Sequence, residues 1–242
     1  MMNIAVKTMI MKELNSSLSS KKYILSLSLN LIIVIVLAFG LTNNINRLDS
    51  LNISFLEVLF IGLPLFNILI SNISLLNEIF VNEKLVKTFE AMLTTPLSLF
   101  EIVISKLISI SVLTYVMLIS SVTSLYLIWG LKLNSFISFP SEIWIMIFVI
   151  VPLFGILYST LSSYLILRFN YTKLTEILNI PLIFGFIFLF RDPSKLLDLF
   201  TSGKIVSYPT IISLFILLTI FYIIMFSLIK KINVENVTVS KL

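Results

Sequence analysis

The chain has 242 residues, of which 58% are hydrophobic and 12% are charged, and its mean hydropathy is +1.10. In an average soluble domain roughly a quarter of the residues are charged, so this composition excludes an ordinary soluble globular protein. The net charge of +5 is spread over segments that flank apolar runs, which favours lipid headgroups over nucleic acid as its partner, and no cysteine is present to form a disulfide or a thiolate site. We therefore expect an all-α integral membrane protein.

Residues 1–22 are predicted to form an amphipathic helix that lies on the cytoplasmic membrane surface. Apolar residues recur at helical spacing, and two lysines lie off that stripe. The apolar positions are Ile4, Met11, Leu14 and Leu18, and the lysines are Lys7 and Lys12. An unstructured tail is the alternative, because Asn and Ser are frequent in 15–20.

Six charge-free apolar runs are predicted to cross the membrane, at 23–46, 58–77, 107–131, 143–167, 177–190 and 205–229. A helix rises about 1.5 Å per residue and needs roughly 20 apolar residues to span the hydrocarbon. The fifth run reaches that length only if it starts near Leu174. The runs are continuously apolar and not alternating, which favours helices over a β-barrel.

The distribution of Lys and Arg predicts that both termini are cytoplasmic. With that orientation, 12 of the basic residues lie inside and 5 outside, as the positive-inside rule requires. The expected location is the plasma membrane. The predicted organisation is a cytoplasmic interfacial helix at 1–22, a six-span domain at 23–229 and a cytoplasmic tail at 230–242.

The predicted outer segment at 191–209 keeps six apolar residues, which a plain loop in water would not need. A short helix folded back against the outer leaflet would bury them, and the break at Ser202-Gly203 leaves room for a turn. We therefore expect a partly re-entrant element between spans five and six.

A polar stripe follows one face of the second predicted span. Asn67, Ser71, Ser74 and Glu78 recur at i, i+4, i+7 and i+11. Such a face points to other helices or to a cavity, so Asn67, Ser71 and Ser74 are candidates for a substrate path. Helix–helix packing through small and amide side chains explains the same stripe equally well.

The segment at 82–98 is the charged loop between the second and third predicted spans. Asn82 or Glu83 is expected to open a short helix that Pro96 ends, because proline disfavours helical geometry in the preceding residue. Ser98 and Glu101 form a Ser-x-x-Glu capping box at the start of the next helix. Lys106 is expected near the membrane interface.

This loop resembles the cytoplasmic loop of ABC transporter permeases of the type-2 exporter class. The matching residues are Glu83, Lys84, Thr88, Phe89, Glu90, Leu93, Thr95, Pro96, Ser98, Glu101 and Lys106. Two positions depart from the pattern, since Lys87 and Ser105 stand where the family usually or often has glycine. The motif covers about a tenth of the chain.

The resemblance implies a permease subunit whose cytoplasmic helix docks into a groove on a separate ATP-binding cassette subunit. The residues implied for this ATPase coupling are Glu83, Lys84, Lys87, Thr88, Phe89, Glu90, Leu93 and Pro96. ATP and Mg²⁺ would then bind the partner, and no cofactor is expected on this chain, because its single Gly-Lys pair lacks the rest of a phosphate-binding loop. A second copy of the chain or a homologous permease subunit would complete the transporter.

Enzyme classes are disfavoured because the chain has no histidine and places no ionisable residue in the middle of a predicted span. The neutral spans favour a hydrophobic or amphiphilic substrate for export. Two alternatives stay open: a membrane scaffold or assembly protein that docks a cytoplasmic partner without transport, and an ATP-independent carrier or channel. A charged loop that only orients the protein is the simplest alternative for 82–98.

Overall fold

A computed structural model describes residues 4–45, 52–86, 88–132, 136, 138–169 and 206–232, and the regular structure of those residues is entirely helical. Five of the described helices are long and apolar enough to cross a membrane, which supports a multi-pass membrane protein. These candidate spans are Tyr23–Gly40, Leu56–Asn82, Leu99–Lys132, Ser141–Arg168 and Tyr208–Lys230. The predicted fifth span at 177–190 and residues 191–205 of the predicted outer element lie outside the described residues.

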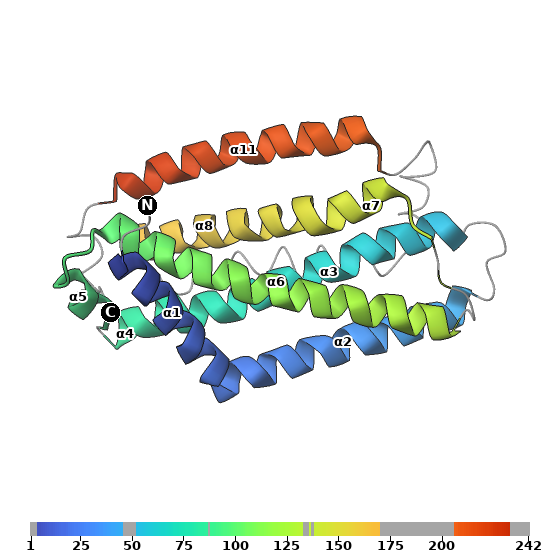
Figure 1. The fold of residues 1–242 in the computed structure, drawn as a ribbon, viewed down its shortest axis with the longest axis horizontal. Coiled ribbons are helices and arrows are strands. Elements are labelled where there is room, and N and C mark those ends of the chain that lie inside the picture. The colour runs from blue at the N-terminus through green and yellow to red at the C-terminus, as the bar shows by residue number, and fades with distance from the viewer. Residues whose placement is uncertain are drawn as a thin grey trace.

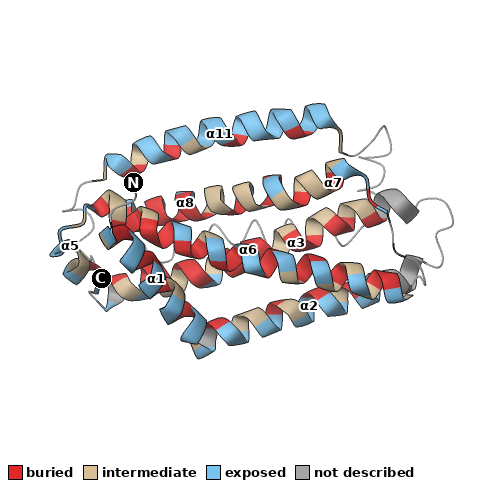
Figure 2. Ribbon diagram, in the orientation of Figure 1, coloured by how far each residue is buried: buried red, intermediate tan, exposed pale blue. Residues whose placement is uncertain are grey.

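The long helices pack side by side with α3 (Asn52–Leu76) and α6 (Leu99–Lys132) at the centre (Figure 1). Helix α2 (Lys21–Ile45) covers one side, and α8 (Val151–Phe169) covers the other. The remaining long helix, α11 (Tyr208–Lys230), packs on α8 and leaves most of its surface exposed (Figure 2). Residues 206–209, which were assigned to the outer element, lead into and begin α11.

Two of the spans contain a π-helical turn. The turn η1 (Asn77–Asn82) continues α3 beyond the predicted end of the second span, and η2 (Met146–Ile150) joins α7 (Ser141–Ile145) to α8. A π-helical turn inserts one extra residue and shifts the register of the side chains that follow. After η1 the chain forms α4 (Glu83–Leu85) and α5 (Thr88–Leu93) at one end of the bundle.

The predicted capping box at the start of α6 is confirmed. The Ser98 backbone N–H donates to Glu101 Oε2 at 2.9 Å, and the Glu101 backbone N–H donates to Ser98 Oγ at 3.3 Å. These bonds satisfy N–H groups that a helix start leaves without partners. The box fixes the point at which the chain leaves the α5 loop and enters α6.

At the opposite end of the bundle an aromatic cluster fills the core. Phe60 of α3 is fully buried, stacks on Phe139 with ring centroids 4.3 Å apart, and meets Trp144 edge-on at 5.4 Å. Trp129 of α6 lies 5.8 Å from the same ring. Because aromatic rings bury large apolar areas, this cluster holds α3, α6 and α7 together at that end.

Helix α1 (Ile4–Ser19) packs on α6. The buried residues are Val6, Met9, Ile10, Glu13 and Ser17. Ile4, Met11 and Leu18 of the predicted apolar stripe are exposed on another face, so their predicted contact with the membrane surface stays a prediction. The stripe did not indicate the packed face, because Glu13, a polar residue, binds a charged partner inside the bundle.

A glycine sets the close approach of α8 to α3. A Cβ atom at Gly155 would lie 2.5 Å from Ile68 Cγ2 and 3.1 Å from Asn72 Nδ2. Asn72 Nδ2 also donates to the Gly155 carbonyl at 3.0 Å. This contact requires a residue without a side chain on the facing helix.

Gly155→Ala should therefore destabilise the protein by about 1–3 kcal/mol through overpacking. Gly62→Ala is the matched control, because a Cβ atom there meets nothing within 4 Å and alanine favours a helix by up to about 1 kcal/mol. Unfolding in mixed detergent micelles measures both variants. Equal stability of the two variants would show that the α3–α8 contact is not tight at Gly155.

Candidate functional site

The segment between α3 and α6 forms a compact structure at one end of the bundle (Figure 1). The predicted single helix is divided into α4 and α5, with Val86 outside both helices. The Thr88 hydroxyl donates to the Glu83 carbonyl at 3.1 Å, which joins α5 back to α4. Thr94 and Thr95 then donate to carbonyls of α5 and end that helix before Pro96.

A buried ion triad of Glu13, Glu83 and Lys106 lies beneath this segment. The Lys106 ammonium has a side-chain exposure of 0% and donates to Glu13 Oε1 at 3.0 Å and to Glu83 Oε2. It also donates to the Ile79 carbonyl at 3.3 Å. All three protons of the ammonium thus have acceptors, and the triad connects α1, α4 and α6.

Two aromatic rings line the triad. The Lys106 Nζ atom lies 5.9 Å from the centre of the Phe80 ring and 6.0 Å from the centre of the Phe89 ring. Both rings are almost fully buried, and their centroids are 6.5 Å apart. An ammonium at these distances is attracted to the negative face of a ring, so Phe89 holds α5 against the same charge that fixes α4.

Lys84, the neighbour of Glu83, reaches a different helix. Its Nζ atom donates to the Ile166 carbonyl in the last turn of α8 at 3.0 Å. A cation near the carbonyl end of a helix interacts favourably with the helix dipole. Glu83 and Lys84 therefore connect α4 to α6 and α8, and Lys106 in turn binds Glu13 of α1.

Burial dominates the protonation of both α4 residues, which lie outside the candidate spans. Burial raises the pKa of the Glu83 carboxyl above its ordinary value, and the charge of Lys106 only partly opposes this change. Burial lowers the pKa of Lys84 from 10.5 to about 8. Keeping Glu83 and Lys84 charged therefore costs free energy of desolvation, which for Glu83 the ion pair with Lys106 partly offsets.

The predicted coupling residues divide into an inner and an outer set. The structure places Glu83, Lys84 and Phe89 against the bundle, and it leaves Thr88 and Pro96 exposed and Glu90 and Leu93 partly exposed. Lys87 lies outside the described residues. Lys106, which was expected near the interface, is fully buried because two carboxylates from distant segments meet it.

The role predicted for the polar stripe in α3 stays a prediction. Ser71 accepts a bond from Asn30 Nδ2 of α2 at 3.2 Å, which is a helix-packing contact, and Ser74 is exposed. Asn67 is buried, and within the described part of the chain its amide atoms have no hydrogen-bond partner. None of these three residues is among those that line the cavity described next.

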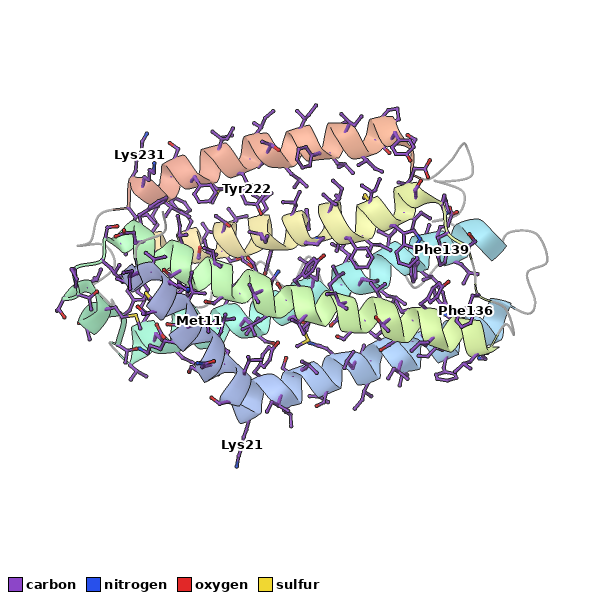
Figure 3. All side chains as sticks on the ribbon, in the orientation of Figure 1. Met11, Lys21, Phe136, Phe139, Tyr222 and Lys231 are labelled. Atoms are coloured by element: carbon purple, nitrogen blue, oxygen red, sulfur yellow. The ribbon has the colours of Figure 1, made fainter. Side chains whose placement is uncertain are left out.

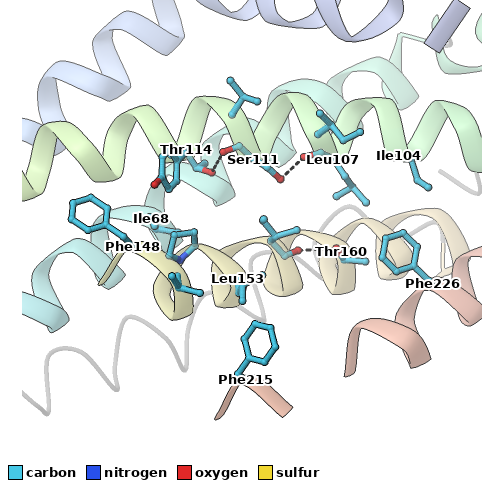
Figure 4. A pocket seen from close by; sticks show the side chains of 16 residues that line it. Ile68, Ile104, Leu107, Ser111, Thr114, Phe148, Leu153, Thr160, Phe215 and Phe226 are labelled. Atoms are coloured by element: carbon cyan, nitrogen blue, oxygen red, sulfur yellow. Dashed lines mark hydrogen bonds between the residues drawn. The ribbon is translucent and has the colours of Figure 1, made fainter. Parts of the chain in front are cut away.

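A cavity of about 660 Å³ lies between α6, α8 and α11 (Figure 4). Its wall is apolar apart from a few hydroxyl groups. The described lining residues include Ile68 from α3, Leu107 and Ser111 from α6, Leu153 and Thr160 from α8, and Phe215 and Phe226 from α11. The volume falls in the range of small-molecule sites, roughly 300–1,000 Å³.

The chain was also compared with known proteins. A scan against protein-family models, a search of curated proteins and a search of solved structures each found no match.

Removal of the Lys106 charge should be strongly destabilising. Lys106→Met leaves the buried Glu13 and the partly buried Glu83 without a counter-charge, and the expected cost is about 3–5 kcal/mol. The triple variant Lys106→Met, Glu13→Gln, Glu83→Gln removes all three charges and should recover most of the loss. Equilibrium unfolding in micelles compares the two, and a triple variant as unstable as Lys106→Met would contradict the triad.

Stability should also depend on pH through Lys84. Its pKa is lower in the folded state than in the unfolded state, so the unfolded chain binds more protons between about pH 8 and 10.5. The free energy of unfolding therefore rises with pH in that window, relative to a Lys84→Met control. Thermal unfolding of both proteins at several pH values measures this difference. The same pH dependence of stability in the wild type and in Lys84→Met would rule out a contribution from Lys84.

Proposed function

We propose that the chain is the transmembrane permease subunit of an ATP-driven exporter, energised by a separate ATP-binding cassette subunit. The observation that carries this proposal is a short helix, α5, anchored to several spans through buried contacts and exposed on its other side. A force applied to α5 would reach the bundle at these anchors. A loop that only orients the protein does not need them.

The anchors direct that force into specific helices. Phe89 attaches α5 to the core, Glu83 and Lys106 attach α4 to α1 and α6, and Lys84 attaches α4 to α8. Both ends of the segment are also continuous with spans, through η1 and the Ser98–Glu101 cap. Displacement of α5 by an ATPase would thus tilt α3 and α6 together and pull on α8.

The directions of the helices support six spans. The Ser141 and Tyr208 hydroxyls are 3.0 Å apart at the starts of α7 and α11, and Tyr222 farther along α11 donates to the Leu153 carbonyl of α8 at 3.0 Å. Helices α8 and α11 therefore run in the same direction, as Figure 1 shows. The described end of α8 and the start of α11 therefore lie at opposite ends of the bundle, which supports the predicted crossing at 177–190.

The orientation in this proposal places α5 and both termini in the cytoplasm. The substrate would be hydrophobic or amphiphilic, because the described cavity is lined by apolar side chains and no charged residue is among them. Two copies of the chain, or this chain and a homologous subunit, would flank the transport path in the plasma membrane.

The outer surface of α5 provides the test. The chain is co-expressed with a candidate ATP-binding subunit, and the pair is purified and reconstituted. Ala91→Arg and Glu90→Lys should abolish co-purification and substrate-stimulated ATP hydrolysis, because Ala91 is exposed and Glu90 is partly exposed on α5. The unfolding temperature should be unchanged.

Asn15→Arg, an exposed change on α1, is the matched control and should leave both activities intact. Co-purification of all three variants with the ATPase would contradict the role of α5. Stable association without ATP-dependent transport would instead favour a membrane scaffold.

A further inference from the structure

The cavity between α6, α8 and α11 has a neighbour at the same end of the bundle as α5. This second pocket, of about 230 Å³, lies between the last turns of α8 and α11. Its described lining residues are Tyr164, Arg168, Leu228, Lys231 and Ile232. Unlike the larger cavity, it is cationic.

The two pockets follow one face of α8. Leu153, Ile156 and Thr160 line the apolar cavity, and Tyr164 and Arg168 line the cationic pocket. The steps between these residues are three or four positions, which keeps them on one side of a helix. The apolar cavity and the cationic pocket therefore follow one another along the same face of α8, and we refer to the two together as the groove.

The apolar part of the groove offers no free hydrogen-bond donor from its Ser and Thr side chains. Ser111 donates to the Leu107 carbonyl at 2.7 Å, Thr114 to the Ser111 carbonyl at 3.2 Å and Thr160 to the Ile156 carbonyl at 2.7 Å (Figure 4). Each hydroxyl is committed to its own helix. Apart from Tyr115, the described wall offers a polar ligand no uncommitted side-chain donor to replace its lost hydration, whereas a hydrocarbon chain needs none.

The cationic end carries two lysines that have no acidic partner among the described residues. Neither Lys230 nor Lys231 forms an ion pair in that part of the chain. Lys230 lies over the Phe100 ring at 5.2 Å from Nζ to the centroid, and Arg168 lies over the Tyr164 ring at 5.6 Å. The Phe100 ring lies 6.3 Å from the ring of Phe226 in the cavity wall, so these aromatic contacts hold Lys230 and Arg168 close to the groove.

We propose that this groove binds an anionic phospholipid from the leaflet on the α5 side. The phosphate would lie in the cationic pocket near Lys231 and Arg168, and one acyl chain would lie along α8 in the apolar cavity. Charge complementarity selects an acidic headgroup over a zwitterionic one, and the apolar wall selects a lipid over a soluble anion. This inference does not depend on ATP-driven transport.

Native mass spectrometry of the purified chain in mixed micelles tests the proposal. The probes are phosphatidylglycerol and phosphatidylcholine with identical acyl chains, supplied together. The wild-type chain should retain phosphatidylglycerol preferentially. Lys230→Gln and Lys231→Gln should each lower that retention about fivefold, the loss expected for one lysine near a phosphate surface.

Two matched controls separate a specific site from general attraction. Lys21→Gln removes an exposed cation at the start of α2, away from the groove, and should leave retention unchanged (Figure 3). Ser111→Phe fills the apolar cavity and should abolish retention, whereas Ser124→Phe places the same ring elsewhere on α6, also at a half-buried serine, and should not.

Three results would overturn the proposal: equal retention of the two lipids, an equal loss in Lys21→Gln, and equal retention by the Ser111 and Ser124 variants. The first would remove the headgroup selectivity, the second would assign the effect to the membrane surface, and the third would exclude the acyl chain from the cavity. Thermal unfolding of each variant shows whether a loss reflects misfolding.

Discussion

The buried ammonium of Lys106 is the interaction on which the arrangement of this protein depends. A charge removed from water costs several kcal/mol, and the structure offsets that cost with two carboxylates, one carbonyl and two aromatic rings. These groups come from α1, η1, α4, α5 and α6. Because one partner alone would leave the charge under-compensated, α1 and the α5 loop have to assemble on α6 together.

The triad also explains why α4 is so short and so firmly attached. Glu83 and Lys84 are adjacent in sequence, yet their charged groups reach α6 and α8 in different places. In a continuous helix from η1 to Pro96, the helical periodicity alone would set the direction of the Phe89 side chain. The break after Leu85 instead permits Phe89 to fold back over Lys106, so the loop gains a buried anchor and an exposed outer face at the same time.

Local patterns predicted much of this fold, whereas its long-range polar contacts were beyond them. The spans follow from run length, and the start of α6 follows from Ser98 and Glu101, because both depend on residues close in sequence. The triad joins Glu13 to Lys106, which are 93 residues apart. The spacing of residues within a helix cannot predict a contact between two such distant segments. One signal was present: Glu13 shares a face with Val6, Met9 and Ile10, and an acid in an apolar stripe indicates a buried partner.

The last turns of α8 connect the two sites. Ile166 accepts the bond from Lys84 of α4, while Tyr164 and Arg168, two residues to either side, line the cationic pocket. A helix turn is nearly rigid, since its backbone hydrogen bonds fix the relative positions of neighbouring residues. A displacement of α4 that carries Ile166 with it therefore also moves the wall of the groove, and an anion that orders Arg168 restricts the turn to which Lys84 is bound. Under the two proposals, anion binding in the groove and ATPase docking at α5 would act on the same turn of α8, and each would then change the affinity for the other by the same free energy.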